Sequence, residues 1–332
     1  MSPPTAKELG RILPDNIRLL SSLIARKPTA HTKKWASVPE QSFFYYTRTN
    51  TINLIHSMNE MLIENGWPFP PLFDVNQELE LLSKDFDLDK RFGMGIFRQL
   101  LLQRSLHRRF LSSSIRSEPK TRAMMYEFHY VRNFRRLYRK LFEIWSKDKV
   151  LEKKKAVLSD IRKCYERKLW SACISTALPL LDLLMRDVLV SNSLNATIQL
   201  MTQALYTHAG LTANAFKPGY AVEHLPFNNI SHNTFARSLE GDLRLPGIYL
   251  ASFFEFANPY YAWYLLASKN APEKLNRHAV IHCAGDYWSR ANAIKLLCFL
   301  ELTRRMRPFF RILIHGETVA MDVIESLRSE FG

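Results

Sequence analysis

Glycine is scarce in this chain, with 11 among 332 residues. A sheet-rich fold needs frequent tight turns, and such turns depend heavily on glycine. Helix-forming residues are spread throughout, and the hydrophobic share of 47% can bury one large core or two ordinary ones. The sequence therefore predicts an all-α fold, a helical bundle.

Long apolar runs are also missing, so no membrane span is expected. The nearest candidate covers residues 248–267, but Glu255 and the pair Asn258-Pro259 interrupt it near its middle. A bilayer penalises polar groups at that depth. We interpret this run as two buried helices separated by a break at Pro259.

Cysteine is limited to four residues, and no two of them form a Cys-x-x-Cys pair. The N-terminus has basic residues but no apolar run after them of the kind a signal peptide requires. We therefore expect a protein of the reducing cytoplasm.

Acidic residues are nearly missing from residues 90–140, which contain 14 lysines and arginines against two acids, Glu118 and Glu127. This segment carries +12 of the net charge of +15. Such a concentration favours a polyanionic partner, because each neutralised phosphate releases a counterion. The alternative is a solvated helix face opposite acidic neighbours or membrane headgroups.

Residues 122–145 are predicted to form a long helix in which aromatic and basic residues alternate. The rings could stack on unpaired bases, but in an amphipathic helix they would face the core, which we favour. The cations are better candidates for binding RNA. They are Arg132, Arg135, Arg136, Arg139 and Lys140.

A lysine-rich junction at residues 146–155 divides the chain into two predicted parts. Residues 1–148 would form a basic helical N-terminal region, in which a short helix at 8–25 adds little to the core. Residues 149–332 would form a C-terminal helical domain. Its first helices are expected at positions 156–167, 169–190 and 195–207.

The C-terminal part of that domain is predicted to be a helical hairpin. Asn270 can cap a first helix over residues 272–283, which Gly285 would end. The second helix is expected to start near Ser289 and to cover residues 291–306.

The first helix of the hairpin carries an arginine and two histidines. His278 and His282 stand at i and i+4 and can face the same way, as zinc-binding histidines do. However, Ala279 occupies the place of a metalloprotease glutamate and no third ligand has a defined spacing, so we expect neither metal nor cofactor. Two interpretations remain: a structural cluster in which Arg277 pairs with an acid, or a site for metal-independent RNA cleavage.

This cluster resembles the signature of the HEPN superfamily of helical nucleases, in which an arginine and a polar residue precede a histidine. Arg277, His278 and His282 match it with four intervening residues. The helix order is also similar: two long helices, a helical insertion and a hairpin that carries the motif. Glycine often follows the last histidine in this family, and Cys283 replaces it here.

The resemblance implies RNA cleavage by 2′-hydroxyl attack without a metal. His282 would be the acid or base and Arg277 the phosphate clamp, while His278 and Asn276 would orient the site. Family members often have an acidic residue on the second long helix that faces the motif, and Asp182 would be that residue here, in preference to Asp187.

The resemblance also implies a homodimer in which two motifs form one groove. Arg277 and His282 lie about 140° apart on an ideal helix, so a second chain or a bent helix start is needed. A toxin or phage-defence role with a neutralising, antitoxin-like partner is associated with the family. The alternatives are a non-catalytic HEPN-like module that binds RNA or protein, and a structural helical protein with acidic partners.

Overall fold

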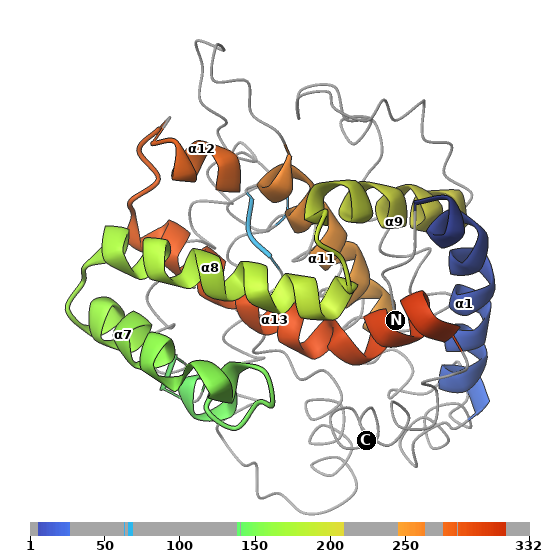
Figure 1. The fold of residues 1–332 in the computed structure, drawn as a ribbon, viewed down its shortest axis with the longest axis horizontal. Helices are drawn as coiled ribbons and strands as arrows, with labels where there is room; N and C mark the ends of the chain where they lie inside the picture. The colour runs from blue at the N-terminus through green and yellow to red at the C-terminus, as the bar shows by residue number, and fades with distance from the viewer. Residues whose placement is uncertain are drawn as a thin grey trace, which may run out of the picture.

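The computed structural model describes residues 6–26, 63, 66–68, 138–139, 141–208, 245–262, 275–283 and 285–316. These residues form an all-α bundle, and no strand occurs among them. Its centre is a pair of packed helices, α8 (Trp170–Leu189) and α13 (Arg290–His315). Figure 1 shows the other helices arranged around this pair.

The first of these neighbours is α7 (Lys155–Glu166), which follows a short 3-10 turn at Leu151–Lys154 and packs against α8. Leu158, Ile161 and Tyr165 form its buried stripe, a spacing of three and four residues that places all three on one helix face. The predicted bounds of α7 and α8 are confirmed to within one residue, because both helices have clear apolar periodicity.

Helix α1 (Ala6–Arg26) packs against α13 and against α9 (Leu194–His208). Its existence was predicted, but the expectation that it adds little to the core is wrong. Leu13, Ile17 and Leu20 are all fully buried, and they share one face because they are spaced at i, i+4 and i+7. The N-terminal segment therefore belongs to the same core as the C-terminal helices.

Helix α11 (Leu245–Tyr261) continues through Pro259, so the predicted pair of helices with a break there is wrong. Proline removes one hydrogen bond to the carbonyl four residues earlier. This loss is confined to the last turn, because the helix ends two residues later. The Asn258 side chain adds two hydrogen bonds, to the Phe254 carbonyl and to the Thr202 hydroxyl of α9, both at 2.8 Å.

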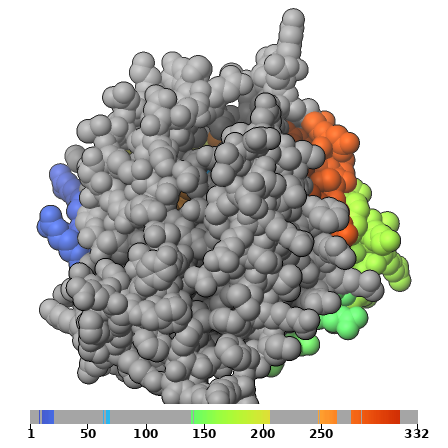
Figure 2. Space-filling model, turned by 180° about the vertical axis from the view of Figure 1, so that it is seen from behind, coloured from blue at the N-terminus to red at the C-terminus, as the bar shows by residue number. Residues whose placement is uncertain are grey.

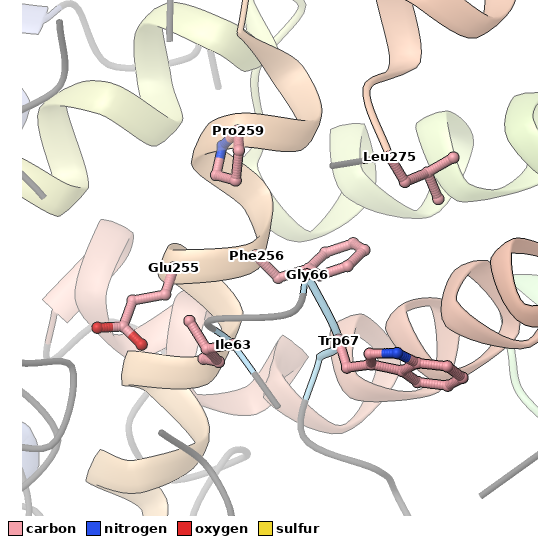
Figure 3. A pocket seen from close by; sticks show the side chains of 7 residues that line it. All are labelled: Ile63, Gly66, Trp67, Glu255, Phe256, Pro259 and Leu275. Carbon is pink, nitrogen blue, oxygen red and sulfur yellow. The ribbon is translucent and has the colours of Figure 1, made fainter. Parts of the chain in front are cut away.

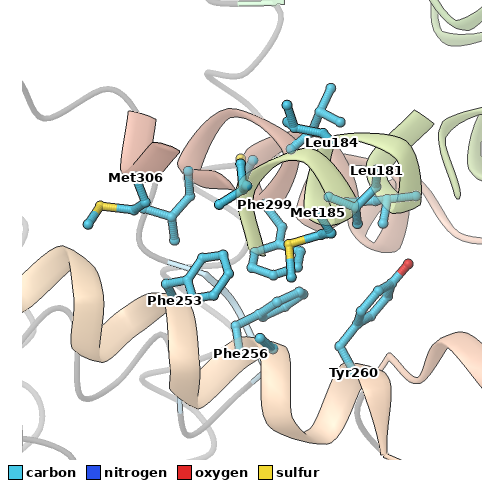
Figure 4. Packing of buried hydrophobic residues seen from close by; sticks show 14 of the residues in the cluster. Leu181, Leu184, Met185, Phe253, Phe256, Tyr260, Phe299 and Met306 are labelled. Carbon is cyan, nitrogen blue, oxygen red and sulfur yellow. The ribbon is translucent and has the colours of Figure 1, made fainter. Parts of the chain in front are cut away.

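Aromatic and aliphatic side chains of α8, α11 and α13 meet in the core (Figure 4). Phe299 of α13 lies with its ring centroid 4.5 Å from that of Phe256 and 5.8 Å from that of Tyr260. On the opposite side, α8 contributes Leu181 and Leu184, which are both fully buried. This packing fixes the register of α11 against α13.

A buried ionic cluster lies on both sides of the predicted boundary at residue 148. Glu301 is fully buried and accepts hydrogen bonds from Trp145 at 2.7 Å and from Arg304 and Arg305. Asp148 pairs with Arg307 at 3.1 Å. These contacts neutralise the arginines near the middle of α13 with buried acids.

The hairpin differs from its prediction at both ends of its first helix. Leu275 and Asn276 are not helical, and α12 covers only Arg277–Ile281, so a continuous helix over 272–283 is wrong. Cys283, with φ +50°, follows the helix end in place of Gly285. The second helix starts near Ser289 as predicted, and Ser289 caps it by accepting from the Asn292 amide at 3.1 Å.

Helix α13 runs on past the predicted end at residue 306 and includes Pro308. Its last turn is tied to α1, because Asn16 donates from Nδ2 to the Leu313 carbonyl at 2.9 Å. Gly316 ends the helix with φ +60°, and a Cβ there would lie 2.7 Å from the Asn16 Oδ1. The contact with α1 therefore requires glycine at this position.

Candidate active site

Asn276 joins the start of α12 to the end of α11. Its Oδ1 accepts from the Ala279 amide at 2.9 Å, as an N-cap does. Its Nδ2 donates to the carbonyls of Pro259 and Ala262 at 2.8 and 3.0 Å. Asn276 is 1% exposed, so its polar atoms are satisfied inside the protein and they hold the motif in place.

Arg277, the first residue of α12, forms an ion pair with Asp182 of α8. Its Nε donates to both carboxylate oxygens at 3.0 and 2.9 Å, and its Nη2 donates to Asp182 Oδ2 at 2.6 Å. The two side chains are 31% and 14% exposed. Of the described residues, none accepts a hydrogen bond from Arg277 Nη1, so one end of the guanidinium remains available.

Asp182 was expected to face the motif, and it contacts Arg277 there. Asp187 does not contact the motif. Asp187 instead pairs with Arg307 at 3.2 Å. Besides Arg277, the Tyr261 hydroxyl donates a hydrogen bond to Asp182, to Oδ1 at 3.1 Å. Asp182 therefore holds Arg277 and the last residue of α11 together.

The pKa values around this pair reflect burial and charge. Burial by itself lowers the pKa of Arg277, but the hydrogen bond and charge of Asp182 outweigh it, so the pKa is raised from its ordinary value. Burial also raises the pKa of Tyr261 well above its ordinary value, and Tyr260 and Asp182 add to this effect. At neutral pH Arg277 therefore carries its positive charge, and the Tyr261 hydroxyl is a donor.

The two imidazoles of the motif contact each other edge to face, with ring centroids 4.5 Å apart and planes at 63°. His278 is half-buried, whereas His282 is exposed at the C-terminal cap of α12. The chain then turns sharply at Cys283, whose φ of +50° lies in the left-handed region that favours glycine. Cys283 therefore stands at a position whose backbone conformation suits glycine.

An open cleft of about 380 Å³ lies beside this motif, between the turn that joins α8 to α9 and the start of α12. Arg277 and His278 line it, and His282 does not. Its other walls come from the end of α11 and from the first turns of α9. In the view from behind (Figure 2), the part of the chain that includes α12 reaches the surface at the edge opposite α1.

A second, enclosed cavity of about 10 Å³ lies under the end of α11 (Figure 3). Glu255 and Phe256 of α11 line one side of it, and Gly66 and Trp67 line another. This volume is about what one water molecule needs. Leu275, next to Asn276, also lines it, so the cavity adjoins the motif without offering room for a substrate.

No group of three or more metal-ligating side chains occurs within the described ranges. His278 and His282 therefore stand without a third ligand from that part of the chain. Of the helices described, none is both long and apolar enough to cross a membrane.

The predicted RNA-binding cations fall mostly outside the described residues: Arg132, Arg135, Arg136 and Lys140. Arg139 is described and is exposed. Tyr138 and Phe142 on either side of it are 5% and 6% exposed and belong to the core. For these two rings, the interpretation as core residues is confirmed.

Sequence reasoning missed two residues of this region, Arg186 and Tyr261. Arg186 lines the cleft one helical turn after Asp182, and this i+4 spacing was a signal available in the sequence. Tyr261 could not be found in that way, because its contact with Asp182 depends on how α11 packs against α8.

Comparisons with known proteins gave no match to a family model, to a curated protein or to a solved structure. A function for this chain is therefore argued from the geometry around Asp182, Arg277 and the two imidazoles.

Proposed function

We propose that this chain is a metal-independent endoribonuclease of the HEPN type, acting in the cytoplasm. The observation that carries the proposal is the fixed position of Arg277. Asp182 holds two of its nitrogens, while the same five-residue helix and its cap carry His278 and His282. Attack of a ribose hydroxyl on a phosphate is catalysed by an imidazole that moves the proton and a fixed guanidinium that stabilises the charge on the phosphate.

In the proposed reaction, the imidazole of His282 accepts the proton of a ribose 2′-hydroxyl. The resulting oxygen attacks the adjacent phosphorus, and the bond from phosphorus to the 5′-oxygen breaks. The leaving oxygen takes up a proton, so the products are a 2′,3′-cyclic phosphate and a free 5′-hydroxyl. Arg277 stabilises the charge on the phosphate oxygens through its Nη1, and Asp182 keeps the guanidinium plane in place.

In this scheme His278 and Asn276 take no part in proton transfer but hold the catalytic groups in place. Asn276 sets the start of α12 by capping it and by binding two carbonyls of the α11 end. His278 contacts the His282 ring and also lines the cleft. It therefore lies where it can orient the catalytic imidazole relative to bound RNA.

We further propose a homodimer in which two motifs form one groove. His282 is exposed and does not line the cleft of its own chain, so an arginine and a histidine from different chains can act on one phosphate. Ile281, beside His282, is 50% exposed, and a second chain would cover this apolar side chain. A toxin or phage-defence role with a neutralising antitoxin-like partner is part of the same proposal.

The decisive experiment incubates purified protein with total RNA in excess chelator and identifies the ends of the fragments. We expect cyclic phosphate ends with the wild type, and a loss of at least 100-fold in rate for His282→Ala. His282 is exposed, so this substitution should leave the circular dichroism and the melting temperature unchanged. Unaltered cleavage by a folded His282→Ala protein would refute the nuclease proposal.

Arg277 is tested with Arg277→Lys, which keeps the charge but not the two-nitrogen contact with Asp182. We expect at least a tenfold loss of cleavage. Arg167→Ala is the matched control, because Arg167 is an exposed arginine at the end of α7. Equal rates for the two variants would mean that Arg277 has no role in the reaction.

The second candidate is a non-catalytic RNA-binding protein. The exposed position of Arg139, on a helix whose neighbouring rings are buried, favours it. In that case charge reversal at Arg139 should weaken RNA binding and should make the affinity less dependent on salt concentration. His282→Ala should leave the affinity unchanged.

A further inference from the structure

The cleft beside the motif has two cationic ends. Arg277 lines it, and no described residue accepts a hydrogen bond from its Nη1. Arg186 of α8 also lines it, is exposed, and forms no ion pair within the described residues. The neighbouring acid Asp187 does not neutralise Arg186 through an ion pair, because it pairs with Arg307 instead. Two arginines therefore line one shared cleft.

Of the described residues that line this cleft, none is acidic. The first residues of α9, Leu194 to Ala196, form part of its wall. Helix α9 has no acid in its first turn, so the partial positive charge of its amino end is not offset locally. This field adds to that of Arg186 and Arg277, and the cleft as a whole attracts an anion.

Amide side chains provide the rest of the polar lining. Asn195 and Gln199 stand at i and i+4 on α9, so they share a face, and both are half-buried in the cleft wall. Each amide offers a donor and an acceptor together, the combination that reads the edge of an unpaired base. Tyr261 lines the cleft as well, with its hydroxyl already donated to Asp182.

The cleft volume of about 380 Å³ is at the lower end of the range for sites that take one small ligand. A duplex does not fit in such a space, whereas one splayed nucleotide does. We propose that this cleft binds a single nucleotide unit of the RNA, with the phosphate between Arg186 and Arg277 and the base against Asn195 and Gln199. This inference rests on the proposed function for the choice of a ribonucleotide as ligand.

Arg186 is thus assigned as a phosphate-binding residue, and Gln199 as a residue that determines base preference. Arg277 lines the cleft and is the proposed clamp of the scissile phosphate, so the bound unit would be adjacent to the nucleotide that is cleaved. The identity of the base in the cleft would then select the cleavage sites.

Binding is tested by NMR titration of the full-length protein with probes that lack a 3′-phosphodiester and therefore cannot be cleaved. The probes are adenosine, cytidine, guanosine and uridine 5′-monophosphates and inorganic phosphate. We expect Arg186→Ala to weaken binding of the best nucleotide about 10- to 100-fold, as for loss of a charged hydrogen bond. The matched control Arg167→Ala should change it less than twofold.

Base reading is tested with Gln199→Ala, which should reduce the difference in affinity between the best and the worst nucleotide at least threefold. Equal losses from Arg186→Ala and Arg167→Ala would overturn the site. Competition by inorganic phosphate at the same concentration as the nucleotides would overturn base recognition.

The outcomes also separate this inference from the nuclease proposal. Nucleotide binding that depends on Arg186, in a protein whose cleavage is insensitive to His282→Ala, would refute the proposed ribonuclease reaction but support the proposed nucleotide site. Cleavage that instead requires His282 but shows the same rate and site preference in Arg186→Ala and Arg167→Ala would support the proposed ribonuclease reaction but refute the proposed nucleotide site.

Discussion

Arg277 and Asp182 are 95 positions apart in the chain and form a two-nitrogen ion pair, with Nη2 2.6 Å from Oδ2. The pair fixes the first residue of α12 to the middle of α8. Because Asp182 also accepts from Tyr261, three helices meet at one carboxylate. The candidate active site is therefore held by contacts between packed helices.

This relationship can be measured with a double-mutant cycle of Arg277→Ala and Asp182→Ala. The free energy of unfolding of the four proteins, from urea denaturation, should give a coupling energy of about 1–3 kcal/mol, because each single change leaves a partly buried charge without its partner. Strictly additive losses would show that the ion pair contributes nothing to stability.

Asn276→Ala should lower the free energy of unfolding by about 2–4 kcal/mol. The change removes an N-cap and also the donors of two buried carbonyls, those of Pro259 and Ala262. Ser289→Ala is the control, because Ser289 caps α13 with an exposed hydrogen bond and should lose only about 1 kcal/mol. Equal losses would mean that the two carbonyl contacts do not matter.

Cys283→Gly should raise the free energy of unfolding by about 0.5–1 kcal/mol. At φ +50° a residue with a Cβ is strained, and this gain exceeds the entropy that glycine adds to the unfolded chain. Cys283→Ser keeps the Cβ and should leave stability unchanged. A glycine variant that melts below the serine variant would contradict the proposed strain.

Stability should fall in acid through the buried Glu301. Burial raises the pKa of Glu301, but the charges and hydrogen bonds of Arg304 and Arg305 outweigh it, so the folded pKa lies below the ordinary value of 4.5. Its contribution is therefore complete above about pH 4.5 and is lost as the pH falls through the folded pKa.

Glu301→Gln tests this directly by denaturation as a function of pH. At pH 7 the variant should be about 3–5 kcal/mol less stable, since the half-buried Arg304 and Arg305 both lose the buried carboxylate of Glu301. Its stability should then decline less steeply below pH 4.5 than that of the wild type. The exposed Glu152 provides the control, and Glu152→Gln should retain the wild-type slope.

Periodicity predicted most of the helices that carry the site. Helices α7, α8 and α9 begin and end within one residue of their expected bounds, because their apolar residues recur at helical spacing. The start of α13 near Ser289 was also predicted. The choice of Asp182 over Asp187 came from the resemblance, and the ion pair with Arg277 agrees with it.

Other predictions failed where long-range contacts decided the structure. Asn270 and Asn276 are both able to cap a helix, but Asn276 also finds two carbonyls at the end of α11, and this contact sets the start of α12. Pro259 was predicted to break α11, although its cost at the last turn is small. The apolar face of α1 was undervalued, because its partners on α9 and α13 lie nearly 190 and 300 residues away.

The amino-acid sequence by itself determined that this protein is helical, where most of its described helices lie, and which arginine and histidines stand together. These properties depend on neighbours within a few residues, which periodicity and caps report. Only the tertiary structure decided that Asp182 and Tyr261 meet at Arg277, and that Arg186 and the first turn of α9 share a cleft with it. Such contacts depend on how helices distant in sequence pack against one another, and local spacing does not encode that packing.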